Sequence, residues 1–167
     1  YPGGPEVEAL AKTGDPQYFK LKAGVVKGRP LHFSFSGLKT KVLYAAKGQS
    51  SNKHSPLTIT EKEKAHLAAS FQECALKDIV NKSQLALKSA SYKNIILGGG
   101  VCNNQRLHKL FLENIQELPF FFPPKGLTMD NAAMIAGLGF HYYDKNPDGD
   151  PLDLEASARL PFQTIIQ

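Results

Sequence analysis

An alternation of strands and helices between residues 93 and 143 constrains the fold of this chain more than any other feature. The segment "KNIILGGG", residues 93 to 100, reads as a short apolar strand that ends in glycines, and "PFFFPP", residues 119 to 124, as a second strand stopped by prolines. Between them, apolar residues recur at helical spacing, namely Leu107, Leu110, Phe111, Ile115 and Leu118. A final helix is expected from about Asp130 to Tyr143. This order predicts a parallel strand pair joined by a right-handed crossover, and therefore an α/β fold.

A capping box marks the start of a longer helix upstream. Thr60 is followed by Glu63, a spacing that lets each side chain bond the other residue's backbone amide, and the helix should continue to about Ser89. Its expected core face consists of Ala68, Phe71, Ala75, Ile79 and Ala86, widened by Leu76, Val80 and Leu87. The sequence therefore predicts a long, well-buried helix before the first strand.

The start of the chain gives weaker signals. "YPGGP", residues 1 to 5, is expected to be a turn, because proline fixes φ and glycine reaches φ values that other residues avoid. A short helix over Glu6 to Lys12 should follow. In "LHFSF", residues 31 to 35, apolar and polar residues alternate, which is typical of a half-buried strand. Ser36 is the expected cap of a helix from Gly37 toward Ala46.

Basic residues gather in one stretch of the chain. The net charge is +5, but residues 16 to 60 contain no Asp or Glu. The Lys and Arg residues of this acid-free segment are Lys20, Lys22, Lys27, Arg29, Lys39, Lys41, Lys47 and Lys53. Such a segment suits a polyanion such as RNA or DNA, because neutralising phosphates releases their counterions. A solvated, lysine-rich surface is the alternative, and charge alone does not choose between the two.

Composition points away from membrane and secreted classes. No apolar run approaches the roughly 18 residues that a membrane span needs, and no amino-terminal stretch has the pattern of a secretory signal. The chain does not begin with Met, and "YPGGPEVEAL" reads like a sequence entered partway through. Cys74 and Cys102 suit a reducing compartment better than a disulfide framework. We therefore expect a cytoplasmic protein that acts without a membrane.

The segment "ILGGGVCNN" is the first candidate binding site. Ligands of α/β sheets collect at the carboxyl ends of strands, where helix N-termini present unpaired amides. Glycines let the backbone approach a phosphate, and Asn103 or Asn104 could cap the following helix or bond a ribose. The segment matches neither G-x-x-x-x-G-K-[ST] nor G-x-G-x-x-G. A tight turn and a phosphate cradle both remain open from these residues alone.

Asp130 is the second candidate, because it stands at a predicted helix start after the second strand. An N-cap role explains an Asp there; a carboxylate ligand for a cation is the alternative. The histidines show no zinc-ligand spacing such as H-E-x-x-H. Cys102 stands beside a helix start, where packing is favoured over a nucleophilic role.

Five motifs taken together resemble one known family. In order they are "YPGGP", "FSFSGLKT", "AASFQE", "GGGVCNN" and "FPPKGLTMDNAAMIA". They resemble the carboxyl half of the TsaD family of tRNA threonylcarbamoyladenosine transferases, formerly called O-sialoglycoprotein endopeptidases, over nearly residues 1 to 145. The resemblance implies an actin-like ATPase fold of the sugar kinase and Hsp70 superfamily, RNase H-like, with a helical insertion. It also implies transfer of a threonylcarbamoyl group from its adenylate to N6 of the adenosine 3′ of the anticodon, in tRNAs reading codons that begin with A.

By motif position, the resemblance implies roles for five residues. Gly4 and Asn104 look like adenine nucleotide or adenylate contacts, Gly99 and Gly100 like the phosphate side of the site, and Asp130 like a ligand of the family's iron or zinc. The resemblance identifies no catalytic residue. The family's H-x-x-x-H metal ligands and its S-G-G-H phosphate turn belong upstream of "YPGGP", so we expect the chain to be inactive by itself. Asn103 stands where the family commonly has Ala, and "LTMD" replaces a run usually rich in Cys or Thr.

The resemblance suggests a division into a basic insertion or lid segment (residues 1–60), an α/β nucleotide-binding lobe (61–145) and a carboxyl-terminal tail (146–167). The implied partners are tRNA and TsaB- and TsaE-like proteins of the threonylcarbamoyl-transfer complex. Two other functions stay open: a metal-dependent O-sialoglycoprotein endopeptidase, and a non-catalytic module that binds RNA or a protein partner.

Overall fold

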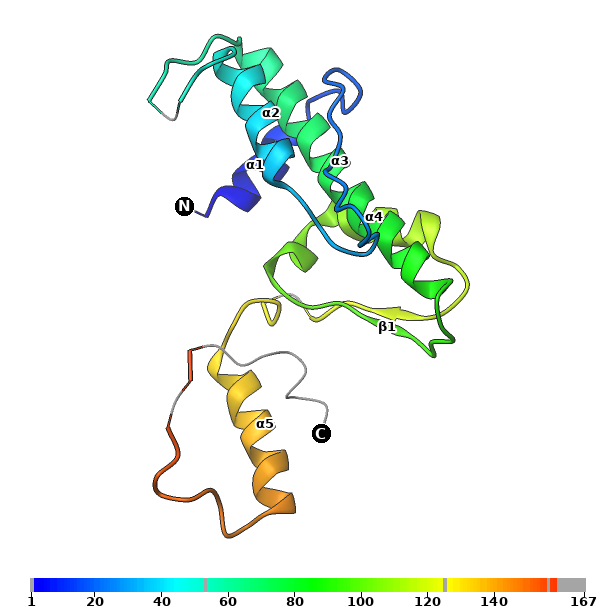
Figure 1. Cartoon of the computed structure of the whole chain (residues 1–167), viewed down its shortest axis with the longest axis vertical. Coiled ribbons are helices and arrows are strands. Elements are labelled where there is room, and N and C mark those ends of the chain that lie inside the picture. Colours follow the sequence, from blue (N-terminus) through cyan, green and yellow to red (C-terminus); the bar gives the residue numbers. More distant parts are fainter. Residues whose placement is uncertain (1, 53, 125, 156, 159–167) are drawn as a thin grey trace. The chain divides into compact units, whose positions relative to one another are not determined.

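The chain folds into two compact units, Tyr1–Met129 and Asp130–Gln167. A computed structural model describes residues 2–52, 54–124, 126–155 and 157–158 (Figure 1). The elements of the first unit are α1 (Gly3–Ala11), α2 (Ser36–Lys47), α3 (Glu61–Leu87), β1 (Ile95–Ile96), a 3₁₀ turn (Gly100–Asn103), α4 (Gln105–Asn114) and β2 (Phe120–Phe121). The second unit contains α5 (Ala132–Lys145).

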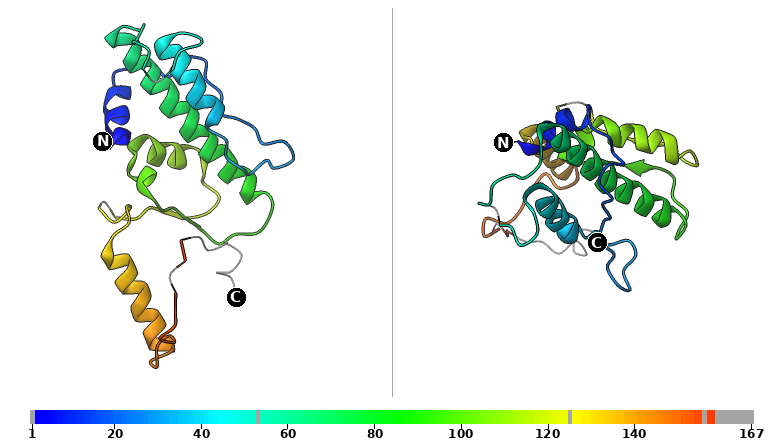
Figure 2. Two further views of the ribbon diagram at one scale, coloured as in Figure 1. Left: turned by 60° about the vertical axis from the view of Figure 1, so that its left-hand side comes forward. Right: turned by 90° about the horizontal axis from the view of Figure 1, so that it is seen from above.

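Helix α3 is the centre of the first unit, and its predicted start is confirmed. The Glu63 amide donates to Thr60 Oγ1 at 3.2 Å, and the Thr60 amide donates to Glu63 Oε2 at 2.9 Å, which completes the capping box. Helices α1, α2 and α4 all pack against α3, and Figure 2 shows α2 lying along it. Because neighbours cover α3 on several sides, its buried positions form no single stripe.

The buried face of α3 differs from the predicted one. Ala68, Leu76 and Val80 are buried as expected. The predicted residues Phe71, Ala75, Ile79, Ala86 and Leu87 are only half-buried. The positions buried instead are Ala65, Leu67, Ala69, Ser70 and Glu73. The prediction followed apolar residues and therefore could not include the serine and the glutamate.

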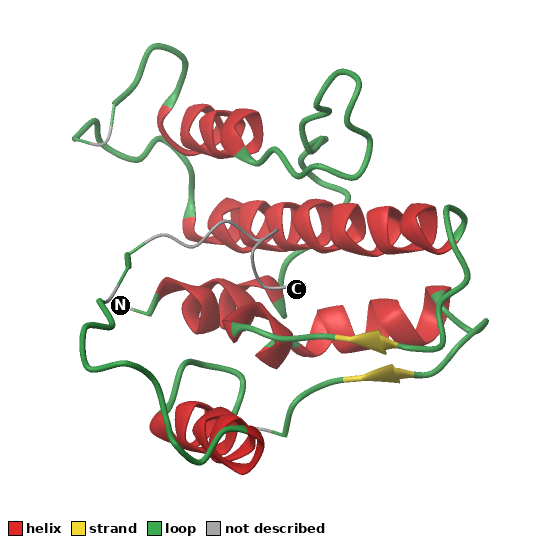
Figure 3. Ribbon diagram, turned by 60° about the horizontal axis from the view of Figure 1, so that its bottom comes forward, coloured by secondary structure: helices red, strands yellow, loops and turns green. Residues whose placement is uncertain are grey.

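The main core forms where α3, α4 and the strands meet. Its buried members are Leu76, Val80, Leu107, Leu110, Phe111 and Ile115, with Ile95, Leu97, Phe120 and Phe122 packed against them. The strands pair in parallel, with Ile95 opposite Phe120 and Ile96 opposite Phe121 (Figure 3). The predicted parallel pair, with α4 in the connection between the strands, is therefore confirmed, as is the α4 core face apart from the half-buried Leu118.

The expected turn at "YPGGP" is wrong. Gly3, Gly4 and Pro5 form the first turn of α1, which begins after the extended Pro2. Proline is tolerated there because the first amides of a helix have no intrahelical acceptor in any case. Packing does require glycine at Gly14, where an added Cβ would lie 2.0 Å from the Ala65 carbonyl oxygen.

The expected strand over residues 31 to 35 is also wrong. The segment forms only an isolated antiparallel bridge between Gly24 and Ser34, and Phe33 and Phe35 are exposed. A two-residue alternation describes a strand only if another strand supplies a hydrogen-bonding ladder. Ser36 does not act as the predicted cap: α2 begins at Ser36 without a side-chain cap, and the Ser36 carbonyl accepts from Thr40 Oγ1 at 3.3 Å.

Helix α5 begins two residues after the predicted start, and no residue within it is buried. Its glycines, Gly137 and Gly139, have nothing within 4 Å of an added Cβ, so no close packing among the described residues requires glycine at either position. Across the part of the chain that the structure describes, no helix combines the length and apolar character that a membrane crossing requires.

Candidate functional site

Two loops leave the same edge of the parallel strand pair and border an open hollow. Because β1 and β2 point in the same direction, the glycine loop after β1 and the proline-rich loop after β2 lie at one end of the sheet. A cavity of about 480 Å³ lies between these loops and the start of α4. Its lining residues are Cys102, Asn103, Gln105, His108, Pro123 and Gly126. This volume is within the range of small-molecule sites.

The glycines of the loop differ in the backbone conformation and the space that each position has. Gly99 has φ +91°, a backbone conformation that favours glycine. An added Cβ on Gly100 would lie 2.6 Å from Met129 Sδ, so a larger residue here would have to displace the flexible Met129 side chain. Gly98 and Gly99 are exposed and have nothing within 4 Å of an added Cβ. The outer side of the loop is therefore open to a ligand.

Cys102 and His108 form one wall of the hollow. Cys102 is buried, its Sγ donates to the Gly98 carbonyl at 3.2 Å, and burial raises the pKa of its thiol. The burial of Cys102 and its bond to Gly98 agree with the packing role that the sequence favours. His108 Nε2 lies 2.7 Å from the Cys102 carbonyl oxygen, and its ring stacks on Phe122 with centroids 3.6 Å apart. Because a carbonyl only accepts, this contact puts the hydrogen on Nε2.

Asn104 caps α4 and joins it to α3. Its Oδ1 accepts from the Leu107 amide at 3.1 Å, as the sequence allowed, and its Nδ2 donates to Gln72 Oε1 at 2.8 Å. These bonds leave one side-chain hydrogen and one lone pair for other partners. Asn104 does not line the hollow, whereas Asn103 and Gln105 on either side do.

A carboxylate from α1 accepts a hydrogen bond from the first backbone amide of α4. Glu8 Oε1 accepts from the Gln105 amide at 2.8 Å, and a negative charge is favourable at a helix N-terminus. Gly4 precedes Glu8 by one helical turn on the same face of α1. The fold thus brings the face of α1 that carries Gly4 toward the end of α4 that carries Asn104. Gly4 itself is exposed, with nothing within 4 Å of an added Cβ.

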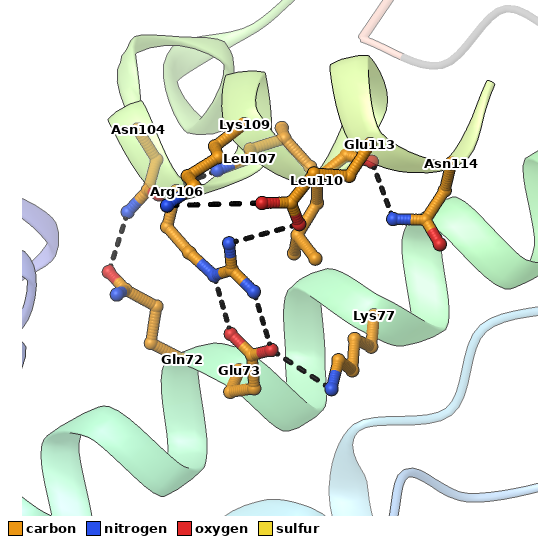
Figure 4. A network of polar contacts seen from close by, with 10 residues as sticks. All are labelled: Gln72, Glu73, Lys77, Asn104, Arg106, Leu107, Lys109, Leu110, Glu113 and Asn114. Atoms are coloured by element: carbon orange, nitrogen blue, oxygen red, sulfur yellow. Dashed lines mark hydrogen bonds and ion pairs between the residues drawn. The ribbon is translucent and has the colours of Figure 1, made fainter. Parts of the chain in front are cut away.

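An ion pair between the buried Glu73 and the half-buried Arg106 fixes α4 on α3 (Figure 4). Arg106 Nε donates to Glu73 Oε2 at 2.7 Å and Arg106 Nη2 to Glu73 Oε1 at 2.8 Å, while Lys77 Nζ lies 3.0 Å from Glu73 Oε1. The Arg106 hydrogen bonds hold the pKa of Glu73 below its ordinary value of 4.5, against the effect of burial. Glu73 is 8% exposed. The hydrogen bonds and charges of Arg106 and Lys77 thus offset the cost of removing the Glu73 carboxylate from water.

Sequence reasoning did not single out Glu8, Gln72, Glu73 or Arg106. One signal for Glu73 was available: with Ala69, Leu76 and Val80 it follows the spacing of a buried helical face, and an acid at such a position needs a cationic partner. No comparable signal existed for Glu8, because its partner is a backbone amide distant in the sequence.

Asp130 belongs to the second unit and is exposed. The N-cap of α5 is the next residue, Asn131, whose Oδ1 accepts from the Met134 amide at 3.1 Å. The N-cap alternative for Asp130 is therefore wrong. No group of three or more His, Cys, Asp or Glu side chains that could hold a metal occurs among the described residues. One carboxylate does not fit a metal ion by itself.

The acid-free segment, residues 16 to 60, lies in the first unit and exposes most of its charge. The exposed basic residues are Lys20, Lys22, Lys27, Arg29, Lys39 and Lys41, and Lys53 lies outside the described residues. They are distributed over α2 and the long connection from α1.

The fold and the hollow define an α/β protein with a ligand-sized cavity at the carboxyl ends of parallel strands. The family model for tRNA N6-adenosine threonylcarbamoyltransferase, TsaD, matches residues 1–137. The chain therefore belongs to this family, which confirms the resemblance found in its motifs.

Curated relatives carry the same name. The tRNA N6-adenosine threonylcarbamoyltransferase of Protochlamydia amoebophila is 50% identical over 165 residues, which cover 99% of this chain and 48% of that protein. That of Chlamydia caviae is 46% identical over 166 residues, or 99% of this chain and 47% of the relative. That of Chlamydia felis is 48% identical over 140 residues, or 83% and 40%. The chain spans about half the length of these relatives.

Proposed function

We propose that this chain is the nucleotide-binding portion of a transferase that modifies tRNA. The observation that carries the proposal is the glycine loop at the strand ends, whose Gly98 and Gly99 are exposed, within the residues that match the family. The hollow beside this loop is lined by its neighbours Cys102 and Asn103 and by the start of α4. In the proposed reaction, N6 of the adenosine 3′ of the anticodon attacks the carbonyl carbon of threonylcarbamoyl-adenylate. The bond from that carbon to the phosphate oxygen breaks, AMP leaves with the electron pair, and N6 loses a proton.

The adenylate is proposed to lie against Gly4, Gly99, Gly100 and Asn104. The exposed side of the glycine loop supports this placement, because its backbone is open there. Glu8 affects where the phosphate sits: its carboxylate already accepts from the first amide of α4 and would repel a second anion at that point. The phosphate is therefore proposed to lie over the glycine loop rather than on the Gln105 amide.

The remaining family features are proposals of the same kind. They comprise an actin-like fold, a basic insertion over residues 1–60, a nucleotide lobe over 61–145 and a tail over 146–167.

Asp130 is proposed as one ligand of iron or zinc that needs further ligands. Metal content of the full-length protein with and without Asp130→Ala tests this, and an unchanged content would contradict it. TsaB- and TsaE-like partners and a cytoplasmic location complete the proposal.

Binding of AMP to the 167-residue chain tests the nucleotide site. Gly4→Ala adds a methyl group where nothing lies within 4 Å, so the fold should tolerate it. We expect roughly tenfold weaker AMP binding, equivalent to about 1.4 kcal/mol, because the methyl group would occupy space proposed for the ligand. Gly3→Ala, equally open and in the same helical turn, is the matched control and should leave binding unchanged. Equal affinities of all three proteins would remove Gly4 from the site.

Activity is tested by mixing the chain with threonylcarbamoyl-adenylate and unmodified tRNA. We expect no threonylcarbamoyladenosine, because the chain spans only about half the length of its relatives. Product from these components alone would show that the residues present suffice.

The exposed acid-free segment supports a second candidate, a non-catalytic RNA-binding module. That candidate predicts tight tRNA binding with steep salt dependence and no AMP binding.

A further inference from the structure

Two exposed aromatic rings stand within the acid-free segment. Phe33 is 50% exposed and Phe35 is 37% exposed. Their rings are nearly parallel, with an interplanar angle of 15° and centroids 5.9 Å apart. Single exposed apolar residues are common on protein surfaces. Exposed rings that lie side by side are a stronger sign that another molecule binds there.

The rings are held in place rather than carried on a free loop. The Gly24 amide donates to the Ser34 carbonyl at 2.9 Å, which closes the loop between these residues. Lys82 Nζ of α3 lies 4.7 Å from the centroid of the Phe33 ring and also pairs with Asp78 at 2.6 Å. This cation–π contact fixes Phe33 on α3 while half of the side chain remains exposed.

The charges of the segment select the kind of molecule that would cover these rings. Exposed basic residues precede the rings at Lys27 and Arg29 and follow them at Lys39 and Lys41. The segment itself contains no carboxylate. An apolar protein partner would gain little from such cations, whereas a polyanion with flat apolar groups would use both features. Single-stranded RNA has this combination of phosphates and bases.

We propose that Phe33 and Phe35 form a stacking platform for unpaired RNA bases, with the exposed lysines of the same segment and Arg29 neutralising the phosphates. This inference rests on the proposed function, since it specifies which surface would hold the RNA and which part of the RNA it would hold. In a duplex the faces of the bases are already stacked on their neighbours. The platform should therefore prefer loops and single strands to paired stems.

The test compares single-stranded RNA containing 2-aminopurine with a fully paired duplex of the same sequence. Phe33→Leu combined with Phe35→Leu keeps apolar side chains but removes both rings. We expect about tenfold weaker binding of the single strand, less than twofold change for the duplex, and loss of the 2-aminopurine quenching that stacking produces. Replacing Lys27 and Arg29 with Gln should weaken both RNAs and reduce the salt dependence of binding.

Tyr92→Leu is the matched aromatic control, because Tyr92 is also 50% exposed and lies outside the segment. Circular dichroism establishes that each variant is folded. Unchanged single-strand affinity and quenching in the Phe33 and Phe35 variant would overturn the inference. The two proposals fail in different ways. If only the stacking inference is wrong, the wild-type chain binds AMP and the double variant quenches 2-aminopurine as the wild type does. If only the nucleotide proposal is wrong, the wild-type chain does not bind AMP, while the double variant still loses the quenching.

Discussion

Helices α4 and α5 have the same kind of N-cap but differ in burial. Each is capped by an asparagine, Asn104 or Asn131, whose Oδ1 accepts from a backbone amide at 3.1 Å. Helix α4 buries Leu107, Leu110 and Phe111 in the main core, whereas no residue of α5 is buried. The capping signal therefore fixes where a helix starts but has no bearing on whether it is covered.

The two sequences differ in how they distribute apolar residues. Helix α4 has one apolar face and a polar opposite face, so a single neighbouring layer covers what must be buried. Helix α5 carries large apolar side chains on all sides, including Ile135, Phe140 and Tyr142. A helix of that kind needs more than one covering surface. Whether one neighbouring layer can cover the apolar side chains of a helix therefore depends on how they are distributed around the helix, rather than on how many there are.

The largest expected contrast comes from one phenylalanine in each helix. Phe111 is 1% exposed and Phe140 is 64% exposed. Phe111→Ala should lower the free energy of unfolding by about 3–5 kcal/mol, because it leaves a cavity in the core. Phe140→Ala should change it by less than about 0.5 kcal/mol. Urea unfolding followed by circular dichroism measures both, with Phe111→Leu as a milder variant. A comparable loss for Phe140→Ala would mean that α5 is covered in solution.

The ion pair beneath α4 should give a smaller effect that depends on pH. Glu73→Gln removes the charge that Arg106 and Lys77 contact, and we expect a loss of about 1–3 kcal/mol at pH 7. The pKa of Glu73 is lowered in the folded chain, so its stabilisation is present above the ordinary value of 4.5 and is lost as pH falls through the folded pKa. The difference from wild type should therefore narrow below about pH 4.5. A difference that stays constant down to pH 2 would exclude a charge effect.

The two caps give the finest test of the comparison. Asn104→Ala removes an N-cap and the bond to Gln72, so we expect a loss of about 1–2 kcal/mol. Asn131→Ala removes an equivalent cap from a helix with no buried residue and should lower the free energy of global unfolding by less than about 0.5 kcal/mol. Equal losses would show that α5 unfolds together with the first unit.

Local signals predicted the elements whose causes are local. The Thr60 and Glu63 capping box, the Asn104 cap and the α4 core face all depend on residues within one or two helical turns. The position of a hollow at the ends of β1 and β2 followed from the order of the elements. Residues 31 to 35 were mispredicted because their alternation lacked the strand ladder that only a distant segment could supply.

The sequence by itself determined the family and the α/β order of elements. Tertiary structure alone decided that Glu8 occupies the first amide of α4, that Asn104 bonds Gln72, and that Arg106 compensates the buried Glu73. The physical reason is the range of the interactions. Caps and periodicities act between neighbours in the chain, whereas a buried charge or a helix end is satisfied by whichever distant group the fold brings within hydrogen-bonding distance.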